Sequence, residues 1–220
     1  MVASFLIPTR KRVPYLRTAI ESIVATARAS EYEILIAMDD DDEQTTAIRW
    51  DVEYYPKVKT CITKRWGYDG LHEYYNILAS MAQGRWLVVW NDDCVMKTEG
   101  WDEILKEHDG EFVLLNPLNM EEQDWTKCFT MFPILPIKWY QTLGRISAYN
   151  HTDDYIDKMT KELGMFTHEH RIRFDHPKDR LKDETGREIR YHRVRFPKAS
   201  YEEDKRKIKK VVESGHKKTS

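Results

Sequence analysis

The sequence lacks the features that mark secreted, membrane-spanning and nucleic-acid-binding proteins. Its three cysteines, Cys61, Cys94 and Cys128, form no CxxC pair and, being odd in number, cannot all pair with one another. We therefore expect reduced thiols in a cytoplasmic protein. No apolar run approaches the roughly 20 residues that a membrane-spanning helix needs. Lys and Arg total 35 against 37 Asp and Glu, so the formal charge of −2 gives no reason to expect nucleic acid as a partner.

Targeting segments and repeats are missing as well. The opening MVASFLIPTRKR places its basic residues after the apolar run, and no small-residue cleavage site follows, so we expect no signal peptide. The chain shows no internal repeat and no low-complexity linker. With 220 residues, 41% of them hydrophobic, it can bury a sizeable core. We expect one domain, residues 1–177, followed by a charged extension, residues 178–220.

The first half of the sequence alternates apolar runs with segments of helical periodicity. The apolar runs predict strands at residues 2–7, 32–38, 58–64, 85–90 and 111–117. The periodic segments predict helices at residues 15–27, 70–84 and 100–108. Because the strands are nearly continuous in apolar residues, both faces of the sheet are expected to be covered. The sequence thus predicts an α/β fold with a mostly parallel central sheet flanked by helices.

The pattern changes after residue 125. An apolar run interrupted by proline, two helices and a late strand are predicted, in order, at residues 128–136, 137–144, 153–164 and 165–174. Residues 199–220 are rich in charge and predict a solvated helix that frays at its end. This tail is expected to make only weak peripheral membrane contact, because its apolar face holds just Ile208, Val211 and Val212.

Charged residues of alternating sign follow the first four predicted strands. A basic set, Pro8–Arg12, follows the first strand, and an acidic set, Asp39–Asp42, follows the second. Lys64–Trp66 and Asn91–Asp93 follow the third and fourth strands. Ligands of open parallel sheets bind beyond the carboxyl ends of the strands. A phosphate-bearing ligand together with a divalent cation satisfies both signs of charge, because carboxylates bind the metal and Arg or Lys binds phosphate oxygens.

The run WLVVWNDD carries an apolar strand directly into two adjacent carboxylates, Asp92 and Asp93. Ionised carboxylates so close together repel one another, and near an apolar core they are costly unless a cation compensates them. The pair therefore predicts a cation at the end of this strand.

Four segments resemble the nucleotide-binding half of a GT-A glycosyltransferase of the family 2 type. They are FLIPTRKRVPYLRTAIESI, EILIAMDDDD, RWGYDGLHEYYNILASMAQGRWLVVWNDD and GWDEIL. The order of these elements is the specific part of the resemblance, which covers residues 2–107 well and extends more loosely to about residue 177. It implies a Rossmann-like GT-A fold with a nucleotide-binding half, residues 1–107, and an acceptor half, residues 108–177.

The resemblance implies a metal-dependent, inverting transfer of sugar from a nucleotide-diphosphate sugar to an acceptor hydroxyl. It places Pro8, Thr9 and Arg10 beside the nucleotide and Asp39 or Asp40 on the base or ribose. Arg65 and the GYDG loop, with Tyr68, are expected to approach the nucleotide or diphosphate. The next helix carries Asn76, which is either a polar site residue or an ordinary residue of the helix surface.

The resemblance also implies a site for Mn²⁺ or Mg²⁺. This chain has Asn91-Asp92-Asp93 where many relatives have Asp-x-Asp or Asp-Asp-Asp. Asn91 is not an anionic ligand, so metal binding falls to Asp93, and Asp92 is expected near the ribose or sugar. Relatives commonly add a histidine from a late segment. We favour His176, which lies in a predicted loop, and then His170.

The general base is expected at the start of the helix that opens with HTDDYIDK. Family 2 enzymes often carry an aspartate two residues before an aromatic residue at such a position. Asp153 has that spacing to Tyr155, and Asp154 is the close alternative. An aspartate at a helix start also caps the helix and complements its dipole, so either residue is equally a candidate for capping.

Two alternatives to a glycosyltransferase remain open from the sequence. A catalytically silent nucleotide- or sugar-binding module is compatible with Asn91 and with the ambiguous base. A sugar nucleotidyltransferase usually carries a glycine-rich loop after its first strand, and the absence of glycine from IPTRKR counts against it. The sugar, the nucleotide base and the acceptor cannot be read from the residues.

Overall fold

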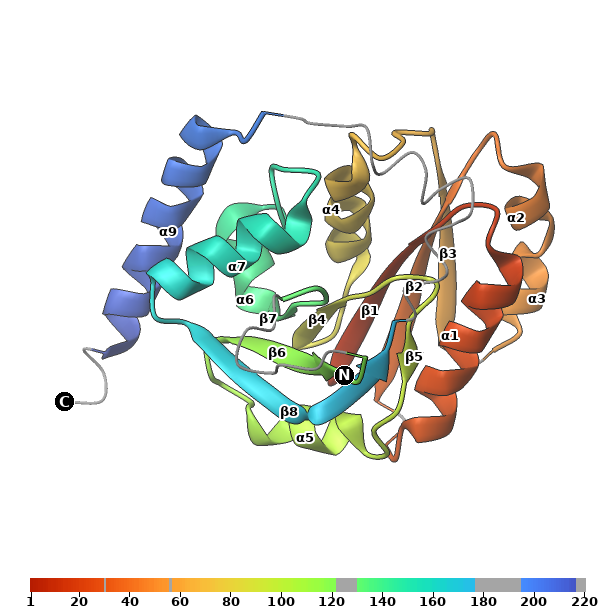
Figure 1. The fold of residues 1–220 in the computed structure, drawn as a ribbon, viewed down its shortest axis with the longest axis horizontal. Coiled ribbons are helices and arrows are strands. Elements are labelled where there is room, and N and C mark those ends of the chain that lie inside the picture. The colour runs from red at the N-terminus through yellow and green to blue at the C-terminus, as the bar shows by residue number, and fades with distance from the viewer. Residues whose placement is uncertain (30, 56, 122–129, 177–194, 217–220) are drawn as a thin grey trace.

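The computed structural model describes residues 1–29, 31–55, 57–121, 130–176 and 195–216. Within these ranges the strands form one eight-stranded sheet in the order β3-β2-β1-β4-β7-β6-β8-β5 (Figure 1). The strands are β1 (Ala3–Thr9), β2 (Tyr32–Asp39), β3 (Val58–Thr63), β4 (Trp86–Val89), β5 (Val95–Met96), β6 (Leu114–Asn119), β7 (Ile134–Pro136) and β8 (Phe166–Asp175). The helices are α1 (Val13–Thr26), α2 (Glu43–Ala47), α3 (Arg49–Glu53), α4 (Leu71–Met81), α5 (Trp101–Glu107), α6 (Ile137–Leu143), α7 (Thr152–Glu162) and α9 (Lys198–His216).

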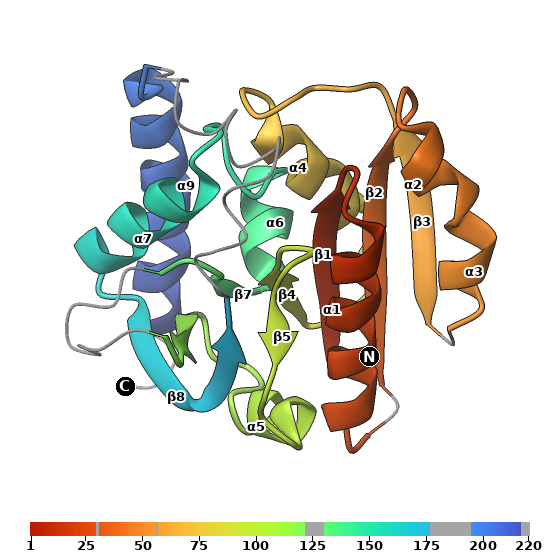
Figure 2. The same cartoon turned by 45° about the vertical axis from the view of Figure 1, so that its right-hand side comes forward.

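The predicted α/β fold is confirmed, and its first half follows the predicted order of elements. β1 pairs in parallel with β2 and β4, and β2 pairs in parallel with β3. Successive residues of β1 enter different cores, because side chains alternate across a strand. Phe5 and Ile7 pack in the core that contains Ile20 of α1, whereas Leu6 packs in the core that contains Leu78 of α4. The two helices therefore cover opposite faces of the parallel strands (Figure 2).

The second half makes the sheet mixed and curled. β7 pairs antiparallel with β4 and with β6, and β5 pairs antiparallel with β8. β6 and β8 are parallel, with a register shift between Pro117 and Leu118. β8 bends away from the plane of β1–β3 (Figures 1 and 2). β5 and β7 were not predicted, since two or three residues are too few to show an alternating pattern.

α9 is not the solvated helix that its charge predicts. Tyr201, Asp204 and Ile208 are buried against the second half of the molecule. Asp204 accepts hydrogen bonds from Arg145 Nε (2.9 Å) and Nη2 (2.7 Å), and from the Tyr155 hydroxyl (2.8 Å). The prediction of a solvated helix was wrong for the face that carries these three residues. A buried carboxylate that accepts two hydrogen bonds from an arginine and one from a tyrosine can take the place of an apolar residue in a helix contact. Residues 178–194 and 217–220 of the predicted extension lie outside the described residues, and the division at residue 177 stays a prediction.

No helix in the described ranges is long and apolar enough to cross a lipid bilayer.

We expect Asp204→Ala to lower the free energy of unfolding by about 3 kcal/mol, because it leaves the Arg145 guanidinium and the buried Tyr155 hydroxyl without their acceptor. Glu203→Ala, at an exposed position next to it in the sequence, is the matched control and should change stability by less than about 0.5 kcal/mol. Urea unfolding followed by circular dichroism measures both. Equal losses in the two variants would contradict the docking of α9.

Candidate active site

A cavity lies at the carboxyl ends of β1, β2 and β4. Because these strands are parallel, their last residues and the loops that follow meet at one edge of the sheet. The space measures about 700 Å³ including the part open to solvent, which suits a ligand of nucleotide size. Its lining consists of Pro8, Thr9, Arg10, Arg12, Asp39, Arg65, Gly67, Tyr68, Leu71, Tyr74, Asn91 and Asp92.

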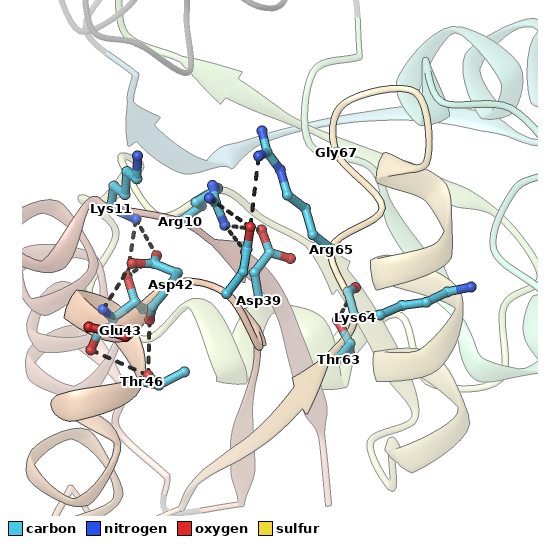
Figure 3. A network of polar contacts seen from close by, with 12 residues as sticks. Arg10, Lys11, Asp39, Asp42, Glu43, Thr46, Thr63, Lys64, Arg65 and Gly67 are labelled. Carbon is cyan, nitrogen blue, oxygen red and sulfur yellow. Dashed lines mark hydrogen bonds and ion pairs between the residues drawn. The ribbon is translucent and has the colours of Figure 1, made fainter.

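Arg10 joins the ends of β1 and β2 through two aspartates. Its Nη1 donates to Asp39 Oδ2 at 2.9 Å and to Asp41 Oδ1 at 2.5 Å. Arg65 Nη1 lies 3.8 Å from Asp41 Oδ2. Figure 3 shows both arginines next to Asp39 at the strand ends. Two guanidinium groups of the cavity lining, from different loops, thus approach one shared carboxylate, that of Asp41.

Tyr74 of α4 fixes Asp39 and the loop after β3 together. Its hydroxyl donates to Asp39 Oδ1 and accepts from the backbone N–H groups of Trp66 (2.9 Å) and Gly67 (3.3 Å). Burial raises the pKa of Asp39, while the hydrogen bonds from Tyr74 and Arg10 act in the opposite direction. Asp39 is therefore a positioned acceptor in the wall of the cavity.

Asp42, which follows β2, holds the loop after β1. Lys11 has a positive φ of 55°, and its N–H donates to Asp42 Oδ2 (2.7 Å) and Thr45 Oγ1 (3.0 Å). Burial raises the pKa of Asp42, but hydrogen bonds from Thr45 and Lys11 lower it below its ordinary value. Asp40 is exposed and does not line the cavity. Of the two residues predicted for the base or ribose, the structure thus brings only Asp39 to the site.

Asp92 and Asp93 share a buried cation, the guanidinium of Arg12. Arg12 Nη1 donates to Asp92 Oδ1 at 3.2 Å and to Asp93 Oδ2 at 3.0 Å. All three side chains are less than 10% exposed. Asp92 Oδ2 also accepts from Thr9 Oγ1 at 2.8 Å. Burial and the charge of Asp93 raise the pKa of Asp92, and Arg12 and Thr9 oppose this rise.

Sequence reasoning missed Arg12. Arg12 is the last residue of a basic cluster and the N-cap residue of α1. Sequence spacing does not show which of the three basic side chains of this cluster contacts the acidic pair. The pattern that could have found it is the buried acidic pair itself, because such a pair needs a cation from within the chain or from solution.

His176 lies beside Asp93 at the end of β8. Its Nε2 is 3.2 Å from Asp93 Oδ1. β5 and β8 pair Val95 with Asp175, so the next residues outward, Cys94 and His176, are neighbours. One ligand atom from each of Asp93, Cys94 and His176 lies within 4.8 Å of the others, and all three residues are buried. This oxygen, sulfur and nitrogen donor set fits a divalent metal ion.

His170 does not join this group. It lies six residues before His176 on β8, where its ring faces that of His168 at a centroid distance of 5.0 Å. Because strand residues advance about 3.3 Å each, His170 and His176 lie at different places along the sheet.

Asp153 lies in the first turn of α7, outside the cavity lining but close enough to Tyr68 of that lining to act on it electrostatically. It is half-buried, and burial raises its pKa to about 7, although a hydrogen bond from Asp154 N to its Oδ1 (3.0 Å) acts against the rise. Burial followed by the charges of Asp153 and Asp154 raises the pKa of Tyr68 to about 12. Asp154 is exposed. The N-cap residue of α7 is His151, so neither aspartate occupies that position.

Asn91 and Asn76 have different surroundings. Asn91 lines the cavity, and its Oδ1 accepts from the Tyr75 hydroxyl at 2.9 Å. Asn76 lies outside the lining and fastens the loop before α7. Its Oδ1 accepts from Ile146 N at 2.7 Å, and its Nδ2 donates to Ser147 O at 3.0 Å. Asn76 is therefore not part of the cavity wall, and it differs from an ordinary surface residue because it holds the loop before α7 through hydrogen bonds.

The curled mixed sheet, with an acidic pair at the end of β4, has the arrangement of the GT-A fold. The mannosyltransferase PcManGT of Pyrobaculum calidifontis, in complex with GDP-Man and Mn²⁺, superposes with a TM-score of 0.64 at 12% identity over 94% of this chain and 68% of that one. S. aureus TarS 1–349 in complex with UDP superposes with a TM-score of 0.61 at 13% identity over 76% of this chain. This comparison covers 57% of the TarS chain.

The profile of the family described as Glycosyl transferase family 2 matches residues 4–160. The chain belongs to this family, as its resemblance predicted. No curated protein sequence shows significant similarity to this chain.

We expect Arg12→Met to lower the free energy of unfolding by about 3 kcal/mol or more at pH 8 in the presence of EDTA, because it leaves two carboxylates buried without their guanidinium. The loss should shrink at pH 5, where protonation relieves the repulsion between them. Guanidinium chloride unfolding at both pH values measures the effect.

Arg17→Met is the matched control for this experiment. Arg17 also belongs to α1, but its ion pair with Asp51 is exposed (43% and 64%) and should contribute under about 1 kcal/mol. An Arg12 variant as stable as the Arg17 variant would show that the acidic pair does not depend on the guanidinium.

Proposed function

We propose that this enzyme transfers a sugar from a nucleotide-diphosphate sugar to an acceptor hydroxyl, with inversion and with the help of a divalent cation. The observation that carries the proposal is the cavity itself. It brings three guanidinium groups, from Arg10, Arg12 and Arg65, together with the acidic residues Asp39 and Asp92.

The two kinds of charge in the cavity suit the two parts of such a donor. Arg10 and Arg65 suit the diphosphate, because guanidinium groups bind phosphate oxygens in pairs of charge-assisted hydrogen bonds. Asp39 suits a ribose hydroxyl or a base N–H, since its carboxylate only accepts when ionised. Structures of TarS with UDP-GlcNAc and of PcManGT with GDP-Man support a nucleotide sugar as donor.

Asp93 and His176 are the residues that would hold the cation, and their buried oxygen and nitrogen donors fit it. When bound, a divalent ion neutralises negative charge on a departing diphosphate. Mn²⁺ or Mg²⁺ is the cofactor expected from the sequence, and Mn²⁺ is present with PcManGT. Asp92 lines the cavity, whereas Asp93 does not, so Asp92 can accept a hydrogen bond from a hydroxyl group of the ribose or sugar.

Asp153 is the proposed general base, with Asp154 as the alternative. A single displacement inverts the sugar and needs one group that takes the proton from the acceptor hydroxyl. A carboxylate whose pKa is raised to about 7 takes a proton more readily than an ordinary aspartate, yet is largely ionised just above neutrality. The half-buried position of Asp153 near the cavity residue Tyr68 supports this role better than the exposed position of Asp154.

The family match favours this reaction over the silent binding module and the sugar nucleotidyltransferase. The proposal includes the cytoplasmic location expected from the sequence. Its support is that Cys61 is a free thiol.

We expect Asp153→Asn to lower donor turnover at least about 100-fold while nucleotide binding is kept, because the change removes the base but leaves the cavity. A thermal-shift screen of nucleoside diphosphates with Mn²⁺ first identifies the base, since a ligand of the folded state raises the melting temperature. Release of that diphosphate from its sugar donors then measures turnover.

Asp154→Asn is the matched control, one residue along the same helix turn. It should keep turnover within about threefold of the parent chain. Loss in the Asp154 variant alone would transfer the base to that residue, and nucleotide binding without turnover in the parent chain would restore the silent binding module.

We expect turnover to rise with pH through an apparent pKa of about 7 and then to level off, because Asp153 must lose its proton before it can act as a base. The direction follows from the raised pKa, since the protonated, inactive form dominates below it. Initial rates at saturating donor between pH 5 and pH 9 give the curve. A rate that is flat from pH 5 upward would exclude a base with this pKa.

A further inference from the structure

Cys94 is a buried thiol in contact range of two metal-binding side chains. It follows Asp93 directly and is fully buried beside Trp90 and Met96 in one core. Most buried cysteines act only as small apolar groups. This one differs because β5 and β8 place it across the ladder from His176, with its sulfur within 4.8 Å of ligand atoms on both neighbours.

The two oxygens of Asp93 have separate surroundings. Oδ2 accepts from Arg12 at 3.0 Å, whereas Oδ1 lies 3.2 Å from His176 Nε2. Bonds of about 2.0–2.2 Å to a tetrahedral ion place neighbouring ligand atoms roughly 3.4 Å apart. Asp93 Oδ1 and His176 Nε2 already have this spacing, so an ion there leaves the Arg12 contact intact. The sulfur lies within 4.8 Å of both atoms, so completing three bonds needs an approach of at most about 1 Å.

We propose that Cys94 is the third protein ligand of the cation that Asp93 and His176 would hold, and that its thiolate makes the site favour Zn²⁺ and Co²⁺ over Mg²⁺. This inference rests on the metal site of the proposed function. When the ion binds, the thiol proton passes to solvent and a metal–sulfur bond forms, with no change of oxidation state. A thiolate and an imidazole select borderline ions, whereas an all-oxygen site selects Mg²⁺ or Mn²⁺.

Cobalt titration of the metal-free protein tests the ligand directly. Co²⁺ bound to a thiolate shows a sulfur-to-cobalt charge-transfer band in the near ultraviolet, and oxygen and nitrogen ligands alone do not. The parent chain should develop this band with one equivalent of Co²⁺. Cys94→Ser should lose it, and its zinc affinity by calorimetry should fall on the order of 100-fold, while its Mn²⁺ affinity changes by less than about 10-fold.

The double variant Cys61→Ser/Cys128→Ser is the matched control, because it leaves Cys94 as the only cysteine of the chain. It should keep the band. If Cys94→Ser fails to fold, X-ray absorption of the zinc-loaded parent chain gives the same answer, with one sulfur at about 2.3 Å.

Three outcomes overturn the inference. They are cobalt binding without the band, a band that survives Cys94→Ser, and zinc-loaded protein without a sulfur neighbour. The first and third leave the proposed metal site standing with other ligands. Failure of the parent chain to bind Co²⁺, Zn²⁺ or Mn²⁺ at all overturns the metal site together with the inference. Nucleoside diphosphate binding and donor turnover, measured separately, then decide whether the sugar transfer itself survives.

Discussion

The buried contact of Arg12 with Asp92 and Asp93 is the constraint around which the site is built. Two adjacent carboxylates at the end of an apolar strand cannot both remain ionised without a compensating charge. Arg12 supplies it from the start of α1, so the contact links β4 to the loop after β1. The same loop is held from its other side by Asp42. The loop after β1 is therefore fixed to β4 on one side and to the loop after β2 on the other.

The acidic residues Asp39, Asp92 and Asp93 are each oriented by contacts to their carboxylate oxygens. Asp39 receives Tyr74 on one oxygen and Arg10 on the other, which orients it in the cavity wall. Asp93 receives Arg12 on one oxygen and turns the other toward His176. The parallel strands set these positions, since their ends fall at one edge of the sheet, and the loops contribute the basic partners.

Sequence patterns predicted the elements that have a continuous apolar run or a clear helical periodicity. β1, β2 and β4 are apolar runs, and residues at or just after the end of each line the cavity. β5 and β7 are too short to show a period, and they follow from pairing with distant strands. Arg12 and Cys94 were missed for a related reason. The inward turn of one arginine and the approach of β8 to β5 depend on contacts between segments far apart in the chain.

The contact between α9 and α7 links a late segment of the chain to the helix that carries the proposed base. Tyr155, which donates to Asp204 of α9, lies two residues from Asp153. During synthesis residues 1–107 leave the ribosome first, since chains emerge from their N-terminus. The helix that carries Asp153 gains its contacts with α9 only after Lys205 has emerged. A nascent chain can thus bring together the cavity residues, which all lie between Pro8 and Asp92, well before α7 reaches its finished surroundings.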